Sequence, residues 1–203
     1  MIAIVDYKAG NLTSVKRALD YLKIENQITA DPHTVSRAER IVFPGVGHAA
    51  TAMSVLEARG LDEALQEAFV DGTPILGICL GSQVVLAHSE EGDTPCLALI
   101  PGTCPRFVLN DSALKIPHMG WNAVSPERGH FVLKDLRPGD EFYFVHAYYP
   151  QPARAEDIFA TSEYEVTFPA AIGHANLFAT QFHPEKSGEI GLKLLQNFAV
   201  WKP

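Results

Sequence analysis

One cysteine of the chain stands in a setting that suits nucleophilic chemistry. Residues 76–81 read Leu-Gly-Ile-Cys-Leu-Gly, which places Cys79 between Gly77 and Gly81. This is the pattern of a nucleophile elbow, where a strand turns sharply into a helix and nearby glycines leave room for the strained turn. Free N–H groups at the start of that helix would favour the thiolate, and the N–H of Leu80 would stabilise an oxyanion.

The other two cysteines, Cys96 and Cys104, have no such neighbours, so we interpret them as ordinary packing residues. An odd number of cysteines without a Cys-x-x-Cys pair is typical of a reduced chain. The N-terminus becomes charged too early for a signal peptide. No stretch reaches the roughly 20 apolar residues of a membrane-spanning helix. We therefore expect a soluble, cytoplasmic protein.

A histidine and a glutamate near the C-terminus supply the partners that a cysteine nucleophile needs. Residues 180–187 read Thr-Gln-Phe-His-Pro-Glu-Lys-Ser. His183 would take and return a proton, and Glu185 would fix the tautomer of the ring. Because residues two apart on an extended chain point to the same side, we expect the two side chains to meet. The His-x-Glu motif is weak evidence by itself, since an ordinary surface turn can contain it. The nucleophile elbow at Cys79 makes a catalytic role for the pair more convincing.

A glycine-containing segment allows two interpretations. Residues 43–50 read Phe-Pro-Gly-Val-Gly-His-Ala-Ala, and their two glycines match the outline of a dinucleotide-binding fingerprint. That fingerprint expects an acidic residue at the end of the next strand, but the corresponding region, 62–67, has a helical pattern. The alternative is a loop of bare backbone whose N–H groups, at Val46 or Gly47, face an oxyanion. We favour this second interpretation.

These segments must be brought together by the fold. Short apolar runs predict buried strands, and apolar residues at three- and four-residue spacings predict helices. The first half of the chain alternates between strands at 2–5, 41–43 and 74–78 and helices over 12–22, 49–70 and 82–88. Such alternation indicates a parallel sheet covered on both faces, with its site beyond the carboxyl ends of the strands.

The second half of the chain changes character. We expect strands near 104–109, 121–124, 141–146, 158–162, 166–172 and 176–182, and a closing amphipathic helix over 190–201. The predicted fold class is therefore α/β: an open, mostly parallel sheet with helices on both faces and antiparallel additions in the C-terminal half. The chain is expected to form one domain over residues 1–203.

The composition excludes some classes of function. The chain has 203 residues, 47% of them hydrophobic, and this is enough for a core without disulfide or metal staples. A net charge of −8 argues against a nucleic-acid binder, which needs a basic surface. His118 and His146 do not have the spacing of metal ligands, and no His, Cys and Asp cluster suggests zinc. We expect no metal and no cofactor.

The three chemical segments together resemble a known family. Residues 44–47, 77–83 and 181–187 look like the signature of the class I, or triad, glutamine amidotransferases, which have a flavodoxin-like fold. The resemblance implies a catalytic triad of Cys79, His183 and Glu185, oxyanion donors at Leu80 and at Val46 or Gly47, and a glutamine pocket formed by Gln83, Glu91, Gly47, Ala147 and Tyr148. The family often has a hydroxyl residue in place of Ala147, but the implied contact there is with the backbone.

Three further segments, 6–11, 117–122 and 143–148, resemble the glutaminase subunits of imidazole glycerol phosphate synthases, which act in histidine biosynthesis. The resemblance implies a heterodimer with a cyclase subunit, which receives ammonia through a shielded channel and on which glutaminase activity depends. The residues implied to face the cyclase are Asn11, Met119, Trp121, Tyr143 and Lys186. For Trp121, simple core packing is an equally good explanation from the residues alone.

Other functions stay open at this point. The nearest alternative is a glutaminase that serves another pathway, such as anthranilate or pyridoxal phosphate synthesis, although segment 117–122 speaks against it. A non-catalytic interaction module on the same fold is a second alternative, and the intact Cys79, His183 and Glu185 argue against it. A dinucleotide-binding protein is a third.

Overall fold

An eight-stranded mixed sheet forms the centre of the computed structural model, which describes residues 1–8 and 10–203. The strands lie in the order β2 (Asn26–Thr29), β1 (Ile2–Val5), β3 (Arg40–Gly45), β4 (Ile75–Cys79), β14 (Leu177–Thr180), β13 (Val166–His174), β12 (Ile158–Tyr164) and β9 (Ser125–Pro126). The first five are parallel, and the last three are antiparallel to their neighbours. The predicted fold class, a mostly parallel sheet with antiparallel additions in the C-terminal half, is confirmed.

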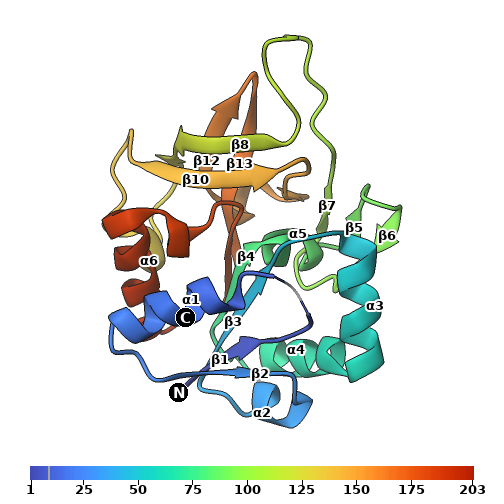
Figure 1. Cartoon of the computed structure of the whole chain (residues 1–203), viewed down its shortest axis with the longest axis vertical. Helices are drawn as coiled ribbons and strands as arrows, with labels where there is room; N and C mark the ends of the chain where they lie inside the picture. The colour runs from blue at the N-terminus through green and yellow to red at the C-terminus, as the bar shows by residue number, and fades with distance from the viewer. Residues whose placement is uncertain (9) are drawn as a thin grey trace.

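Helices cover both faces of this sheet (Figure 1). One face carries α1 (Leu12–Tyr21) and α6 (Gly188–Val200); the other carries α2 (Pro32–Ser36), α3 (Ala49–Arg59) and α4 (Leu61–Val70). The alternation of side chains along a strand explains the two cores. In β3, Ile41 and Phe43 pack with the residues of α3 and α4, whereas Val42 packs with those of α1 and α6.

Two smaller sheets lie beyond the carboxyl ends of the parallel strands. β8 (His118–Ala123) and β10 (Glu141–His146) form an antiparallel ribbon, drawn across the upper part of Figure 1. Its inner face packs Phe142 and Phe144 against Phe182. The remaining elements are a second small sheet and short helices: β5 (His88–Ser89), β6 (Thr94–Pro95), β7 (Gly102–Cys104), β11 (Gln151–Pro152), α5 (Leu80–Val84), η1 (Phe131–Leu133), η2 (Ala155–Asp157) and η3 (Pro184–Lys186).

The helix predicted over 82–88 is wrong in its extent. α5 spans only Leu80–Val84, and the chain then turns toward β5. Leu97 and Leu99 donate their N–H groups to the carbonyls of Val84 and Val85, at 2.9 Å each. Because these carbonyls are taken by a crossing segment, the helix does not continue past them.

Three strand predictions also differ from the structure. The strand predicted over 104–109 is shorter and earlier, at Gly102–Cys104, and its antiparallel pairing continues only as an isolated bridge between Arg106 and Tyr148. β3 does not stop before Pro44; it continues to Gly45 beside β4. β2 was missed, since this edge strand reads Asn-Gln-Ile-Thr and is largely polar. An edge strand buries little, so its sequence carries little apolar signal.

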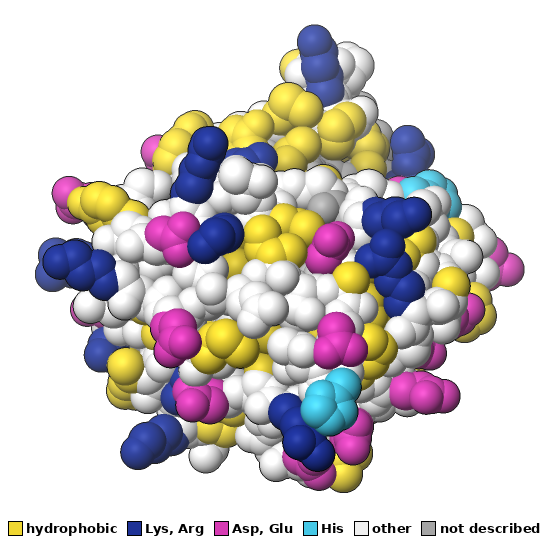
Figure 2. All heavy atoms as spheres, turned by 60° about the horizontal axis from the view of Figure 1, so that its bottom comes forward, with side chains coloured by type: hydrophobic (Ala, Val, Ile, Leu, Met, Phe, Trp, Pro, Cys, Tyr) yellow, Lys and Arg dark blue, Asp and Glu magenta, His cyan; other side chains and the backbone are white. Residues whose placement is uncertain are grey.

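Charges of both signs are mixed on the part of the surface that can be seen. On the face that Figure 2 shows, Lys and Arg side chains alternate with Asp and Glu. Across the described part of the chain, no helix is both long enough and apolar enough to cross a membrane. A cytoplasmic location stays a prediction.

Candidate active site

The strained turn predicted around Cys79 is present. β4 ends at Cys79, which has φ 55° and ψ −108°, a conformation that L-residues rarely adopt. A Cβ added at Gly81 would lie 2.0 Å from the carbonyl oxygen of Phe43 on the neighbouring strand. A Cβ added at Gly77 would lie 2.9 Å from that of Ala179. A Cβ at Gly77 would also lie 3.0 Å from the carbonyl oxygen of Gly81, so the glycines are needed both because adjacent strands press on the turn and because the two positions crowd each other.

The helix after the cysteine acts through its first N–H groups rather than through its length. α5 begins at Leu80, whose N–H belongs to the first turn and has no acceptor within the helix. The Ser82 hydroxyl donates to the carbonyl of Cys79 at 2.7 Å and fixes the turn. Since α5 has only five residues, we attribute its effect on the sulfur to these first N–H groups and not to the dipole of a long helix.

His183 and Glu185 lie in contact. Nδ1 of His183 is 2.8 Å from Oε1 of Glu185, and both side chains are fully buried. They meet through a turn rather than along an extended strand, because Pro184 begins the short helix η3 between them. The amide nitrogen of Asn11, far away in sequence, donates to the same Oε1. A carboxylate only accepts, so Glu185 fixes the ring tautomer that leaves Nε2 without a proton in neutral His183.

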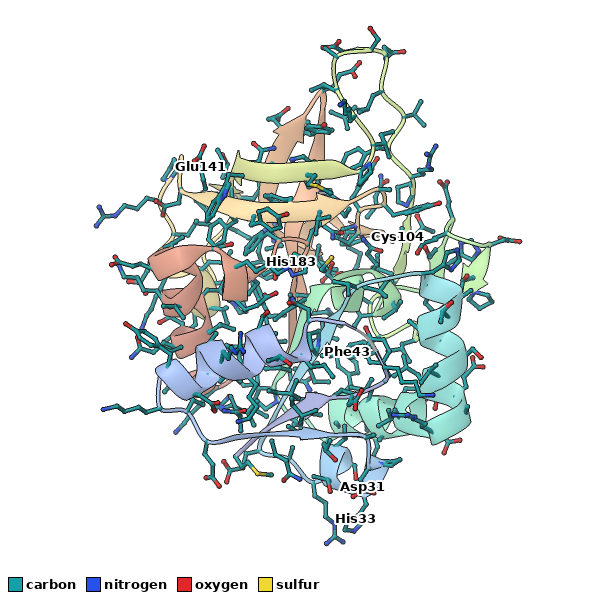
Figure 3. The ribbon with its side chains drawn as sticks, in the orientation of Figure 1. Asp31, His33, Phe43, Cys104, Glu141 and His183 are labelled. Carbon is teal, nitrogen blue, oxygen red and sulfur yellow. The ribbon has the colours of Figure 1, made fainter. Side chains whose placement is uncertain are left out.

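The sheet brings His183 to Cys79. β14 runs parallel to β4, with Thr180 opposite Ile78, so both chains leave the same edge of the sheet within a few residues. Figure 3 shows His183 near the middle of the molecule, between the β8–β10 ribbon and the parallel strands. Two hydrogen bonds to the backbone of His183 hold it there. The N–H of His183 donates to the carbonyl of Tyr143 at 2.9 Å, and the Ser187 hydroxyl donates to the carbonyl of His183 at 2.6 Å.

The electrostatics of His183 show the effect of its neighbours. Burial opposes the charged ring, but the nearby Cys79 and the charge and hydrogen bond of Glu185 outweigh it and raise the pKa of His183 to about 10. Nε2 of His183 has no hydrogen-bond partner in the part of the chain that the structure describes, so it is left to exchange a proton with Cys79, whose charge acts on the ring. The raised pKa keeps the His183 ring protonated at neutral pH, with Glu185 on its Nδ1 side.

Gln181 is a site residue that the sequence analysis missed. Its Oε1 accepts from Nε2 of Gln83 at 2.9 Å, which leaves its own Nε2 to donate to Sγ of Cys79 at 3.6 Å. A donor aimed at sulfur favours the thiolate. The sequence offered a signal for it: Gln181 lies only two residues before His183, and a polar side chain next to the expected catalytic histidine needs a hydrogen-bond partner when it is buried.

A cavity of about 260 Å³ opens beside Sγ of Cys79. It is lined by Cys79, by the oxyanion candidates Leu80, Val46 and Gly47, by the substrate candidates Gln83, Glu91, Ala147 and Tyr148, and by Val145 and His146. Nε2 of Gln83 donates to the carbonyl of Tyr148 at 2.9 Å, and Oε2 of Glu91 accepts the N–H of Ala49 at 2.7 Å. The structure therefore collects every predicted pocket residue around one cavity.

The residues predicted to face a partner divide into two groups. Met119 and Trp121 are 62% and 54% exposed, so core packing does not explain Trp121. Tyr143 lies beside Trp121, with ring centroids 6.2 Å apart, and the Lys186 ammonium lies over the Tyr143 ring at 5.6 Å. These four form a contiguous surface patch on the ribbon and η3. Asn11 is different: its amide points inward to the triad.

No metal site is apparent. Within residues 1–8 and 10–203, no group of three or more His, Cys, Asp or Glu side chains is placed to hold a metal ion. A reaction without metal or cofactor stays a prediction.

Comparison with known proteins places this geometry in a family. The model of the family described as glutamine amidotransferase class-I matches residues 3–201. "Imidazole glycerol phosphate synthase subunit HisH" of Nitratidesulfovibrio vulgaris strain DP4 is 50% identical, over 98% of this chain and 95% of its own length. The protein of the same name from Thiobacillus denitrificans is 44% identical, over 100% of this chain and 92% of its own length.

Solved structures share the fold at low sequence identity. PurLQS from Thermotoga maritima superposes with a TM-score of 0.75 at 18% identity, covering 97% of this chain and 96% of that one. Another crystal structure, described as a glutamine amidotransferase, gives a TM-score of 0.72 at 18% identity, over 98% and 100% of the two chains. The chain therefore belongs to the class-I glutamine amidotransferases and, within them, to the HisH subunits of imidazole glycerol phosphate synthase.

Proposed function

We propose that this chain hydrolyses glutamine at Cys79 and delivers the ammonia to a cyclase subunit, with which it forms a heterodimer that makes imidazole glycerol phosphate. The observation that carries the proposal is the meeting of Cys79 with the buried His183–Glu185 pair at the wall of a cavity that suits a small amino acid. The high identity to HisH subunits supports the choice of pathway over anthranilate or pyridoxal phosphate synthesis.

The first half of the reaction uses the ion pair. The Cys79 thiolate attacks the carboxamide carbon of glutamine, and the resulting oxyanion is held by the N–H of Leu80 and an N–H at Val46 or Gly47. His183 gives its proton to the leaving nitrogen, the C–N bond breaks, and ammonia departs. A γ-glutamyl thioester then remains on Cys79.

The second half returns the site to its starting state. His183, now neutral, takes a proton from water as that water attacks the thioester carbonyl. The C–S bond breaks, glutamate forms, and the Cys79 thiolate and His183 imidazolium are restored. Glu185 holds the ring in the required tautomer through both halves. Ammonia must avoid bulk water, where it is protonated, so it enters the partner through a shielded channel.

The pocket has suitable groups for the amino-acid end of glutamine. Both amide hydrogens of Gln83 are used inside the protein, on the carbonyl of Tyr148 and on Oε1 of Gln181, so its own Oε1 is left to accept from the substrate. Glu91 uses Oε2 on the N–H of Ala49, and its other oxygen is left for the substrate ammonium. The backbone at Ala147 and Tyr148 completes the pocket.

Docking of the cyclase is proposed on the patch of Met119, Trp121, Tyr143 and Lys186. Its large exposed side chains support this, because aromatic residues and methionine are typical anchors of interfaces. Partner-dependent activity is proposed to arise at the peptide between Val46 and Gly47. This peptide borders the glutamine cavity on one side and a second cavity of about 290 Å³ on the other, so it has space to reorient.

The test is to mix the protein with a candidate cyclase subunit, glutamine and the cyclase's phosphoribulosyl nucleotide, and to follow glutamate release. We expect very slow release by the isolated chain and a large rise that needs both partner and nucleotide. High turnover by the isolated chain would reject the gating proposal. An absence of glutamate release under every condition would reject the glutaminase itself.

A further inference from the structure

Two buried histidines outside the triad form a chain of hydrogen bonds that ends at the glutamine pocket. Nδ1 of His146 lies 2.7 Å from the carbonyl oxygen of Tyr148, and Nε2 of His146 lies 3.2 Å from Nδ1 of His118. Nε2 of His118 lies 3.3 Å from the amide nitrogen of Asn122. The same amide nitrogen donates to the carbonyl of Glu163 on β12 at 2.8 Å. Four hydrogen bonds thus link five residues end to end, from Tyr148 to Glu163.

The protons of this chain can be assigned from its ends. A carbonyl only accepts, so Nδ1 of His146 must carry its proton. Burial lowers the pKa of His146 to about 3 and that of His118 to about 4, so both rings are neutral at pH 7. Nε2 of His146 is then an acceptor and Nδ1 of His118 the donor to it. Nε2 of His118 in turn accepts from Asn122. Every bond has one donor and one acceptor.

The aromatic surroundings fix the ring of His118 in this role. It is stacked between Tyr164, at 4.1 Å between centroids, and Phe144, at 5.0 Å, with both pairs inclined by 29°. A ring held on both faces keeps its nitrogens pointing along the plane, toward His146 on one side and Asn122 on the other. The pair therefore has a defined orientation as well as defined protons.

The carbonyl of Tyr148 connects this chain to the catalytic cysteine. It also accepts from Gln83, which donates to Gln181, which donates to Sγ of Cys79. This carbonyl accepts from Nε2 of Gln83 and so leaves Oε1 of Gln83 to face the substrate. If Tyr148 shifted, the Gln83 amide would lose the acceptor that fixes this orientation. His146 is the second donor on that carbonyl and so holds it in place.

The other end of the chain lies on the inner face of β8. Along this strand His118 and Asn122 point inward, whereas Met119 and Trp121 are exposed on the opposite face. One face of β8 therefore belongs to the proposed docking patch. Its opposite face carries His118 and Asn122, which belong to the hydrogen-bond chain that reaches the glutamine pocket.

We propose that His118 and His146 are positioning residues: a bridge of two neutral Nδ1–H tautomers that holds the Tyr148 carbonyl, and through it Gln83, in the geometry that binds glutamine. The role rests on the proposed glutaminase function, but it assigns to these histidines a part that neither the triad nor the oxyanion donors fill. His146 lines the glutamine cavity, but within the described residues neither histidine hydrogen-bonds to Cys79 or His183.

The test uses a pair of matched variants in the complex with the cyclase. In His146→Asn the amide nitrogen takes the place of Nδ1 and can still donate to Tyr148; in His146→Gln the amide reaches the place of Nε2 and that donor is lost. We expect His146→Gln to raise the KM for glutamine roughly 10-fold, the effect of one lost buried hydrogen bond, with a smaller change in kcat. His146→Asn should stay within about threefold of the wild type, because that bond is kept.

His130→Gln is the control, since His130 is a partly buried histidine whose pKa burial also lowers to about 4, but it lies at η1, away from the pocket. Its KM should not change. Synthesis from added ammonia should be unchanged in all three variants, which shows that complex and cyclase are intact. If wild-type complex releases no glutamate, the proposed function fails, and the positioning role that rests on it fails with it.

Nitrogen-15 NMR of the wild-type chain tests the tautomers without any substitution. We expect both His118 and His146 to carry the proton on Nδ1 and to stay neutral down to about pH 5. An Nε2–H tautomer in either ring would overturn the assignment. Equal KM values for His146→Gln and His146→Asn would overturn the positioning role. So would a lower stability of both variants together with an unchanged KM for glutamine.

Discussion

Two cysteines of this chain are equally hidden from solvent yet lie in opposite surroundings. Cys79 is 4% exposed and Cys104 is fully buried, and each is the last residue of a strand, β4 and β7. Cys79 has a strained backbone, an amide donor in Gln181 and an imidazole in His183. Cys104 lies on regular extended backbone in β7, among apolar neighbours.

The difference teaches that burial alone does not decide whether a cysteine can act as a nucleophile. Burial raises the pKa of Cys104 well above its ordinary value, because the thiolate would lose its hydration and gain no cation in exchange. Cys79 instead has the amide donor of Gln181 at 3.6 Å and the positive ring of His183 nearby. What distinguishes the two is the set of polar groups around each sulfur.

Removing each sulfur gives the largest expected contrast. In the complex with the cyclase, Cys79→Ala should lower glutamine-dependent synthesis by roughly 10³-fold or more, because the covalent step is lost, while synthesis from ammonia continues. Cys104→Ala should change it less than about threefold. Steady-state rates with each nitrogen source measure both. Loss of ammonia-dependent synthesis in Cys79→Ala would mean that Cys79 supports the fold.

Chemical labelling sharpens the contrast in the unmodified protein. A diazoketone analogue of glutamine should alkylate Cys79 at least about 100 times faster than Cys104 at pH 7, because the thiolate is the reactive form and the analogue fits the pocket. Cys96 is a useful reference, since it is half-buried and burial raises its pKa to about 11. Mass spectrometry of peptides locates the label. Comparable labelling of Cys79 and Cys104 would contradict the proposed thiolate.

The imidazole reports on the charge of its neighbour. Wild-type His183 should stay protonated through neutral pH, because its pKa is raised to about 10. Cys79→Ser removes the negative charge and leaves burial opposed only by Glu185, so the pKa of His183 should fall. Cys104→Ser should leave it unchanged. NMR titration of the His183 ring measures this, and an equal pKa in wild type and Cys79→Ser would show that the thiolate does not contribute.

The smallest expected effect is on stability and has opposite signs at the two positions. Cys79 has a positive φ that glycine adopts freely, so Cys79→Gly should be more stable than Cys79→Ala by about 1 kcal/mol. Cys104 lies in a strand, so Cys104→Gly should be less stable than Cys104→Ala by roughly 0.5–1 kcal/mol. Urea denaturation of the four variants compares them. The same sign at both positions would mean that the turn at Cys79 is not strained.

Much of the site was predictable because its residues lie in short, continuous segments. The elbow requires glycines on both sides of Cys79, and these are visible in the sequence. Gln181 and the inward amide of Asn11 were missed in their roles, because each acts through a partner about a hundred residues or more away in sequence. The helix predicted over 82–88 failed for a similar reason: residues 97–100 take the carbonyls that it needed.

The sequence by itself determined the alternation of strands and helices, the nucleophile and the pair that serves it, since local spacing encodes these. Only the tertiary structure decided that β14 lies beside β4, which brings His183 to Cys79. It also decided that His118 and His146 form a hydrogen-bonded bridge to Tyr148 instead of filling the core singly. Partners far apart along the chain are set by the packing of whole elements, and no local pattern records that packing.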